Sequence, residues 1–528
     1  MTQKTVAELE AQRLDLQDEL DTKKKGSERN RMGQFATPTG LAVEILRYAK
    51  ARLSRGENVR FIDPAIGTGS FYSALLDVFP KARISEAVGY EIDRHYGEPA
   101  AKLWGDTGLD IRFEDFTRAN TPENAQKFNL LICNPPYVRH HHISNGEKQR
   151  LKMKTWDACG VDFNSLGGLY CYFLGLSHPW MKNGGLAGWL IPSEFMGVNY
   201  GISVKRYLLD KVTLLHIHRF DPSDVQFGDA LVSSAVVWFR KTAPPREHEV
   251  RFTYGGSLNQ PKLDRLIPVK TLRDDPKWTR YPMEKAFKAA QEPVLADFFA
   301  IKRGLATGNN EYFILSAEEI QRRKLPTDAF RPILPSPRYL PDNEIKADKK
   351  GNPLLDRRLF LLNPPWMEAE ISERYPNLWA YLEEGKARGV PGGYLCRHRK
   401  PWYTQENRPP APLLCTYLGR GDKRDGRPFR FILNHSRATA ANVYLMLYPK
   451  SPIERALQVK PELKREIWGV LNEICPKAII GEGRVYGGGL HKIEPRELGN
   501  VPARFIMDLL PNPIVPRRSK QFELFAEL

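Results

Sequence analysis

Short apolar segments alternate with helix-like patterns over the first half of the chain. Between these segments, hydrophobic residues recur at helical spacing, as they do from Leu41 to Leu46 and from Tyr72 to Val78. The alternation indicates a series of βα units and fades after residue 243. The segments that we interpret as strands with their ends are 59–63, 87–93, 111–116, 130–134, 184–192, 214–220 and 231–239.

Polar residues stand at the ends of four successive predicted strands. They are Asp63, Glu91, Asp115 and Asn134. The glycine-rich turn Gly67-Thr68-Gly69 follows the first of them and leads into a helical pattern, which is the arrangement of a nucleotide-binding half-sheet. Glycines let the backbone approach a ligand without an intervening Cβ. Glu91, at the end of the next strand, is suited to accept hydrogen bonds from ribose hydroxyls.

The segment Asn134-Pro135-Pro136-Tyr137 indicates the most specific chemistry. Its prolines end the preceding strand and stiffen the turn, at the edge of the sheet where open α/β folds bind ligands. The side-chain oxygen of Asn134 and the carbonyl of Pro135 are two acceptors that can hold an exocyclic amino group by both of its hydrogens. Such bonds bias the nitrogen of an aromatic amine towards sp3 character and make it nucleophilic. The ring of Tyr137 is suited to stack on the base.

These motifs resemble those of a known enzyme family. Asn134 to Tyr137 matches the catalytic Asn-Pro-Pro-Tyr motif of S-adenosylmethionine-dependent amino-methyltransferases, and 63–71 is similar to the cofactor motif of adenine methyltransferases. Phe35-Ala36-Thr37-Pro38 precedes both, which is the motif order of the gamma class. The chain therefore resembles gamma-class N6-adenine DNA methyltransferases of Type II restriction-modification systems. The resemblance implies an α/β, doubly wound, mostly parallel, Rossmann-like sheet with a C-terminal target-recognition domain.

The resemblance also implies roles for individual residues. The Phe-x-Thr-Pro element would line the methionine end of S-adenosyl-L-methionine, and Glu91 would hold its ribose. Asp115 would accept a hydrogen bond from the adenine amino group of the cofactor, and Phe116 would pack on the adenine ring. Phe227 is the best match for the aromatic residue that stacks on an extruded target adenine, and it suits a core anchor of its loop equally well.

The predicted sites follow from these matches. The expected cofactor-binding residues are Phe35, Thr37, Pro38, Asp63, Pro64, Ala65, Gly67, Thr68, Gly69, Glu91, Ile92, Asp115, Phe116 and Asn134. The expected catalytic residues are Asn134, Pro135, Pro136, Tyr137 and Phe227. No metal site is expected, because three consecutive histidines at 140–142 cannot all face one ion from regular structure and have no acidic or cysteine partner spaced nearby.

The charge of the chain predicts a polyanionic partner. Its net charge is +17 and its pI is near 9.4, which favours nucleic acid over a membrane. Together with the resemblance, this predicts double-stranded DNA, bound by a monomer rather than a dimer, with the target adenine flipped out of the stack. No Asp…Glu-x-Lys cluster is evident, so a cognate restriction endonuclease would be a separate partner.

Other features predict the compartment. The six cysteines show no close pairs, which is typical of free thiols in a reducing compartment. No segment approaches the ~18 apolar residues of a membrane span, and the amino terminus is charged rather than apolar. We therefore expect a cytoplasmic, nucleoid-associated protein of a bacterium or archaeon that does not bind membranes.

The expected domain organisation has three parts. Residues 1–30 form a charged N-terminal helix that either packs on its own domain or pairs with another chain. Residues 31–243 form the catalytic domain, and the Pro-rich segment 242–247 reads as a linker. Residues 248–528 form the DNA target-recognition domain. Its candidate DNA-contacting stretches, rich in arginine, lysine, aromatic residues and glycine, are 302–310, 397–403, 434–437 and 486–492.

Other functions remain open from the sequence. Asn-Pro-Pro-Tyr also serves methyltransferases that act on protein glutamine, and a basic chain suits RNA as well as DNA. A DNA-binding protein with an inactive methyltransferase fold is a third possibility, which the full set of catalytic-type residues disfavours. Methyl-transfer assays on DNA and RNA separate the enzymatic alternatives.

Overall fold

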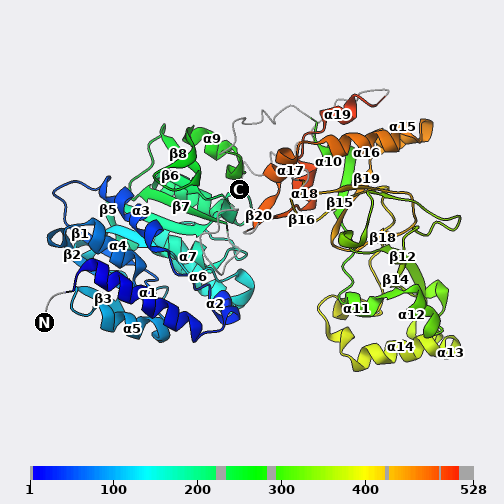
Figure 1. The fold of residues 1–528 in the computed structure, drawn as a ribbon, viewed down its shortest axis with the longest axis horizontal. Coiled ribbons are helices and arrows are strands. Elements are labelled where there is room, and N and C mark those ends of the chain that lie inside the picture. The colour runs from blue at the N-terminus through cyan, green and yellow to red at the C-terminus, as the bar shows by residue number, and fades with distance from the viewer. Residues whose placement is uncertain (1–3, 222–232, 282–292, 422–426, 487–488, 511–528) are drawn as a thin grey trace. The chain divides into compact units, whose positions relative to one another are not determined.

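In the computed structural model the chain divides into two compact units, and each is described by itself (Figure 1). The first unit comprises Met1–Ala286, and the second comprises most of the chain from Phe287 onward. The structure describes residues 4–221, 233–281, 293–421, 427–486 and 489–510.

A nine-stranded sheet forms the centre of the first unit, in the order β3-β2-β1-β4-β5-β7-β6-β8-β9. Its strands are β1 (Val59–Asp63), β2 (Ile84–Tyr90), β3 (Leu109–Arg112), β4 (Phe128–Cys133), β5 (Met181–Pro192), β6 (Thr213–Arg219), β7 (Ser234–Arg240), β8 (Glu249–Gly256) and β9 (Pro261–Pro268). Strands β1 to β5 pair in parallel, as β6 and β8 do, whereas β7 and β9 run antiparallel to their neighbours. The predicted doubly wound, mostly parallel sheet is confirmed.

The strand order reverses between β1 and β4, which creates a crevice at their carboxyl ends. Along each strand, successive side chains point to opposite faces of the sheet. Phe61 and Ile132 pack in the core on one face, whereas Ile62 and Leu131 pack in the core on the other. Because both faces are covered, these strands read in the sequence as continuous apolar runs rather than as alternating patterns.

Helices cover both faces of this sheet (Figure 1). One core cluster joins the sheet to side chains of α1, α3, α4 and α5, and the other joins it to α6 and α7. The helices of the first unit are α1 (Val6–Thr22), α2 (Gly26–Met32), α3 (Thr39–Lys50), α4 (Ser70–Val78), α5 (Arg94–Trp104), α6 (Asn145–Cys159), α7 (Leu169–Leu176), α8 (Gly201–Arg206) and α9 (Val269–Asp274). α7 is apolar around most of its circumference because it is buried on nearly all sides.

The first unit extends past both boundaries that the sequence predicts. Strand β8 follows the Pro-rich segment 242–247 and pairs in parallel with β6, and β9 then pairs with β8. Val250 and Phe252 of β8 are buried in the same core as β6 and β7, so 242–247 is a connection within the unit and not a linker at residue 243. The N-terminal helix α1 packs on α4 and α5, which makes residues 1–30 part of the unit as well.

The second unit is built on three smaller sheets, with strand orders β10-β19-β15-β17-β13, β11-β14-β12-β18 and β16-β21-β20. The strands are β10 (Phe299–Arg303), β11 (Ile314–Ser316), β12 (Phe330–Leu334), β13 (Glu344–Ile345), β14 (Leu359–Leu362), β15 (Leu413–Thr416), β16 (Leu418–Arg420), β17 (Phe431–Asn434), β18 (Thr439–Ala440), β19 (Tyr444–Pro449), β20 (Arg484–Tyr486) and β21 (Leu490–Lys492). The helices are α10 (Leu295–Phe298), α11 (Asn310–Phe313), α12 (Ala317–Arg322), α13 (Glu368–Arg374), α14 (Pro376–Ala387), α15 (Ser451–Val459), α16 (Leu463–Glu473), α17 (Pro476–Glu482), α18 (Pro495–Gly499) and α19 (Arg504–Met507).

All six cysteines are free thiols, as their spacing predicts. Across the described ranges, no helix combines the length and the apolar character that a membrane crossing needs.

Candidate active site

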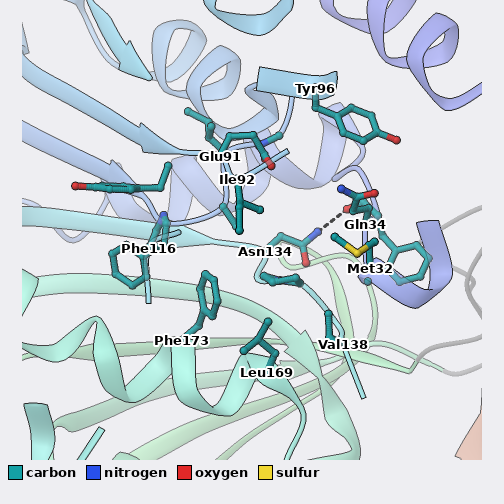
Figure 2. Close-up of a pocket in the computed structure, with 18 of the residues that line it drawn as sticks. Met32, Gln34, Glu91, Ile92, Tyr96, Phe116, Asn134, Val138, Leu169 and Phe173 are labelled. Carbon is teal, nitrogen blue, oxygen red and sulfur yellow. Dashed lines mark hydrogen bonds between the residues drawn. The ribbon is translucent and has the colours of Figure 1, made fainter. Parts of the chain in front are cut away.

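A cavity of about 500 Å³ opens at the carboxyl ends of β1, β2 and β4, where the strand order reverses (Figure 2). Each of these strands ends in, or is directly followed by, a polar residue that lines the cavity: Asp63, Glu91 and Asn134. The sequence places these residues far apart, and the parallel sheet brings them to one edge.

The amide of Asn134 is held in one orientation. Its Nδ2 donates to the carbonyl oxygen of Phe35 at 2.8 Å and to Oγ1 of Thr37 at 3.2 Å. A backbone carbonyl can only accept, so the amide nitrogen must face it and Oδ1 must point the other way. Figure 2 shows the amide oxygen of Asn134 turned away from this contact. Within the part of the chain that the structure describes, no donor reaches Oδ1, and this acceptor stays available at the cavity.

The three residues after Asn134 differ in their relation to the cavity. Within the described residues, the carbonyl oxygen of Pro135 also accepts no hydrogen bond, whereas Pro136 lines the cavity. Tyr137 is only 8 % exposed, does not line the cavity, and donates from its hydroxyl to the carbonyl of Leu190 at 3.0 Å. Its ring packs in the core and lies 5.8 Å from the ring of Phe35, and burial raises the pKa of its hydroxyl.

The glycine-rich turn lies at the start of α4, and its two glycines have different surroundings. Both have positive φ, +56° at Gly67 and +93° at Gly69. A Cβ on Gly67 would meet nothing within 4 Å, because that position faces open space. A Cβ on Gly69 would lie 2.5 Å from Nε1 of Trp104, which itself donates to the carbonyl of Thr68 at 2.9 Å. The first glycine leaves room for a ligand, and the second leaves room for the core.

Two enclosed acids border the cavity, and neither is bonded directly to a cationic side chain among the residues that the structure describes. Asp63 is 1 % exposed and accepts from the N–H of Ala65, and burial raises the pKa of its carboxyl to about 8, with further repulsion from Glu91. Glu91 accepts from the N–H groups of Gly67 at 3.0 Å and Asp93 at 2.7 Å, which fixes the carboxylate plane. Burial raises the pKa of Glu91 to about 7. A cationic ligand would favour the ionised form of both carboxyls.

Aromatic rings enclose the other end of the cavity. Phe116 contacts Tyr90 edge-to-face at 5.4 Å and lies 5.6 Å from Phe173, and all three rings line the cavity. Asp115 lies beside them, but its Oδ1 already accepts from the N–H and hydroxyl of Thr117, at 2.9 and 2.8 Å. Its Oδ2 lies 3.3 Å from Nε of Arg118. These rings give that end of the cavity an apolar wall, on which a flat apolar group can pack.

Most of the predicted cofactor residues meet at this cavity. Those that line it are Phe35, Thr37, Asp63, Pro64, Ala65, Gly67, Thr68, Glu91, Ile92, Asp115, Phe116 and Asn134. Pro38 and Gly69 do not line it: Pro38 precedes the first turn of α3, and Gly69 packs against Trp104. Among the predicted catalytic residues, Asn134 and Pro136 line the cavity and Pro135 and Tyr137 do not. Phe227 lies outside the described residues.

Helix α1 contributes residues to the site that the sequence pattern does not indicate. Gln17 and Asp21 line the cavity, and Gln17 accepts from the hydroxyl of Thr68 at 2.6 Å. Asp21 accepts from the hydroxyl of Tyr96 at 2.8 Å. Arg13, 1 % exposed, donates to Thr68 as well. The signal was present as polar residues that interrupt the apolar face of the helix, but their partners lie far along the chain.

Two candidate DNA-contacting residues of the second unit turn out to have structural partners. Arg399 donates to the backbone carbonyls of Ala306 and Thr307, both at 2.7 Å. Asn434 is 3 % exposed, and its amide bonds the carbonyls of Ala411 and Ala438. Their side chains tie loops together and are not free to read bases.

The fold and the cavity define a class of enzyme. An open sheet of this order, with a glycine-rich turn after β1, an acid after β2 and Asn-Pro-Pro-Tyr after β4, is that of an S-adenosylmethionine-dependent methyltransferase. Residues 93–226 match the family described as Eco57I restriction-modification methylase, and residues 277–521 match the C-terminal domain of the Type II methyltransferase M.Eco57I. The chain belongs to the Type II methyltransferases of restriction-modification systems.

Curated relatives agree with this assignment over most of the chain. The Type II methyltransferase M.XamI of Xanthomonas campestris pv. amaranthicola is 28% identical over 479 residues, which cover 89% of this chain and 84% of that protein. M.AccI of Acinetobacter calcoaceticus is 26% identical over 492 residues, which cover 89% and 85%. Among solved structures, the Type IIL restriction-modification enzyme MmeI in complex with DNA has a similar fold, with a TM-score of 0.54 at 13% identity over 83% of this chain and 65% of that chain.

The cavity fits S-adenosyl-L-methionine, the cofactor of this class. Open space at Gly67 allows close backbone approach, and the two enclosed acids that line the cavity suit a ligand that carries positive charge. The rings of Phe116 and Phe173 suit the adenine at the far end. The sulfonium of this cofactor supplies an electrophilic methyl group.

Proposed function

We propose that this enzyme methylates the N6 amino group of an adenine in double-stranded DNA. One observation carries the proposal. Asn134 presents a fixed amide oxygen at the cofactor cavity, next in sequence to the carbonyl of Pro135, and neither oxygen has a partner among the described residues. Two acceptors without competing donors suit an amino group with two hydrogens.

In this proposal the chain positions the reacting groups and forms no covalent intermediate. Phe35 and Thr37 hold the amide of Asn134 so that its oxygen accepts one hydrogen of the amine, and the Pro135 carbonyl accepts the other. These bonds turn the nitrogen lone pair towards the methyl donor, and much of the catalysis is orientation. The thiol of Cys133 takes no part, because burial raises its pKa well above the usual range.

The proposed cofactor contacts follow the strand ends. Glu91 holds the ribose hydroxyls through the lone pairs that its two backbone partners leave free. Asp63 and the turn at Gly67 face the methionine part, and Phe116 packs on the adenine ring. Asp115 keeps its proposed role towards the adenine amino group through Oδ2, which Thr117 does not bond and which has a second lone pair beside its 3.3 Å contact with Arg118.

The substrate side of the proposal rests on charge. A duplex holds its bases inside the stack, so an adenine must flip out to reach the cavity. Tyr137 and Phe227 are the proposed stacking partners. For Tyr137 this requires the ring to become more exposed than its present 8 %. The net charge of +17 favours a polyanion, and the second unit is the proposed target-recognition domain. A monomer on DNA, paired in the cell with a separate cognate endonuclease, is the form that we propose.

A methyl-transfer assay with labelled S-adenosyl-L-methionine tests the proposal. Duplex DNA, a structured RNA and a protein fraction with accessible glutamine serve as parallel acceptors. We expect label in the duplex alone, and none when Asn134→Ala replaces the wild type. Label in RNA or protein, with none in DNA, would overturn the proposed substrate.

A further inference from the structure

Two exposed arginines flank an exposed tyrosine in the second unit. Tyr339 is 45% exposed, and the guanidinium carbons of Arg338 and Arg357 lie 4.7 and 4.5 Å from its ring centroid. Both distances fall within the ~6 Å range of cation–π contacts. Arg338 precedes Tyr339 in the chain, whereas Arg357 comes from the loop between β13 and β14, so two separate segments converge on one ring.

Hydrogen bonds from Arg430 hold the segment that carries Tyr339 in place. Arg430, next to β17, donates to the backbone carbonyls of Pro337 at 3.1 Å and of Leu340 at 3.2 Å, on either side of Tyr339. It also donates to Oδ1 of Asn343 at 2.7 Å. A guanidinium that makes several bonds to one loop fixes the path of that loop. The exposed ring therefore has a defined position before any ligand binds.

Backbone contacts also hold the loop that carries Arg357 in place. Ala347 and Pro353 form an isolated antiparallel bridge, and the N–H of Leu354 donates to the carbonyl of Lys346 at 2.9 Å. These contacts close the loop that leads to Arg357. The backbone of the folded unit therefore brings the two segments together, and their contact does not depend only on the reach of two long side chains.

The two arginines of this site have no acidic partner in the described part of the chain. Within the described residues, neither Arg338 nor Arg357 forms an ion pair or a side-chain hydrogen bond, although Asp342 and Asp356 lie close in sequence. Two guanidiniums held near one ring repel each other. Stacking leaves their N–H edges free, and those edges match the oxygens of a phosphate.

We propose that Arg338, Tyr339 and Arg357 form a contact site for the sugar-phosphate backbone of double-stranded DNA. The proposal rests on the proposed function, which supplies DNA as the substrate, and it identifies residues outside the active site that bind it. The contact is with phosphates, so it adds affinity to every duplex irrespective of sequence. It lies outside the four stretches that the sequence pattern indicates, because Arg357 and Tyr339 meet only in the folded unit.

Salt-dependent DNA binding tests the proposal. Binding of the full-length protein to a duplex is measured by fluorescence anisotropy between 50 and 200 mM salt (an ordinary working range), for the wild type and for the double variant Arg338→Ala/Arg357→Ala. We expect binding to weaken by a factor of order ten for every duplex, and the slope of log K against log salt to fall by about 0.9 for each arginine removed.

Three further variants separate this role from general effects. Arg322→Ala removes an exposed arginine of the same unit that is paired with Glu319, and it should leave the slope unchanged. The variant Arg338→Lys/Arg357→Lys keeps the charges and should keep most of the slope. Tyr339→Phe should bind like the wild type, whereas Tyr339→Ala should bind more weakly. Thermal midpoint and cofactor affinity, measured on each variant, show that the fold and the active site are intact.

Each contrary result has a distinct meaning. An unchanged slope in the double alanine variant, with wild-type DNA binding intact, overturns the phosphate contact and leaves the proposed function standing. Loss of discrimination between the methylated site and other sequences, at constant slope, shows base reading instead and also overturns it. Failure of the wild type to bind any duplex contradicts the proposed function itself.

Discussion

Asn134 is the residue on which the proposed chemistry depends, and its replacement separates catalysis from binding. Asn134→Ala removes the acceptor that we assign to the target amine, so we expect methyl transfer to fall by at least about 100-fold, the range in which such single positioned groups act. Cofactor affinity should change little, because the cofactor contacts that we propose lie mainly at Gly67, Glu91 and Phe116. Glu91→Ala is the matched control variant, and it should weaken cofactor binding instead. Near-normal turnover of Asn134→Ala in a steady-state assay would remove its proposed role.

The two enclosed acids predict how cofactor binding depends on pH. Burial raises the pKa of Asp63 to about 8 and that of Glu91 to about 7, so both bind protons in the empty folded protein well above their ordinary range. A cationic ligand favours the ionised carboxylates, so its binding releases protons. Affinity for S-adenosyl-L-methionine should therefore rise between pH 6 and about 8, as titration calorimetry can measure. Asp63→Asn should flatten the profile, and an affinity that falls over this range would contradict the assignment.

The same pKa shifts affect stability with a definite sign. In the cofactor-free protein the folded state binds more protons than the unfolded chain between about pH 4 and 8, where the unfolded carboxyls are already ionised. The contribution of Asp63 and Glu91 to the free energy of unfolding therefore falls as pH rises through this window. Urea unfolding of the wild type and Asp63→Asn at pH 5 and pH 8 should show a smaller loss in the variant. Equal losses of stability in the wild type and the variant would show that the pKa of Asp63 is not raised in the folded protein.

At the scale of one element, the turn into α4 makes two different demands on its glycines. Gly69→Ala places a Cβ 2.5 Å from the buried Trp104 ring at a positive φ, so we expect destabilisation of roughly 2–4 kcal/mol. Gly67→Ala meets open space and should cost only about 1–2 kcal/mol of backbone strain. The Gly67→Ala variant should nonetheless bind the cofactor more weakly, because the new Cβ enters the space that we assign to the ligand. Thermal unfolding and cofactor titration of both variants test this contrast, and equal losses of stability would contradict it.

The elements also show why some features follow from the sequence and others do not. Strands β1 and β4 are covered on both faces, so their apolar runs and the polar residues Asp63 and Asn134 at their ends are local signals. Strand β9 lies at the edge of the sheet, and its apolar residues do not alternate with polar ones, because Arg265 takes a half-buried position and Leu266 an exposed one. It therefore looks like part of an irregular region. The Pro-rich connection before β8 then looks like a domain boundary, although pairing with β6 continues the unit.

At the scale of the whole molecule, the sequence does not predict the contacts between residues that lie far apart in the chain. Gln17 of α1 reaches Thr68 of the glycine-rich turn, and Arg357 reaches Tyr339, only once the chain is folded. Conversely, Arg399 and Asn434 look like DNA-binding residues in a basic, polar stretch until their backbone partners are seen. The charge of +17 indicates a polyanion but not which side chains touch it. Composition predicts the kind of partner, and only the fold selects the residues.

The identity of the methylated nucleoside tests the central claim most directly. Duplex DNA lacking modified bases is incubated with the enzyme and S-adenosyl-L-methionine, digested to nucleosides and analysed by liquid chromatography with mass spectrometry. We expect N6-methyl-2′-deoxyadenosine as the product, and we expect it to be absent when Asn134→Ala is used. A product that carries the methyl group on cytosine, or an unmodified digest from active, cofactor-bound enzyme, would contradict it.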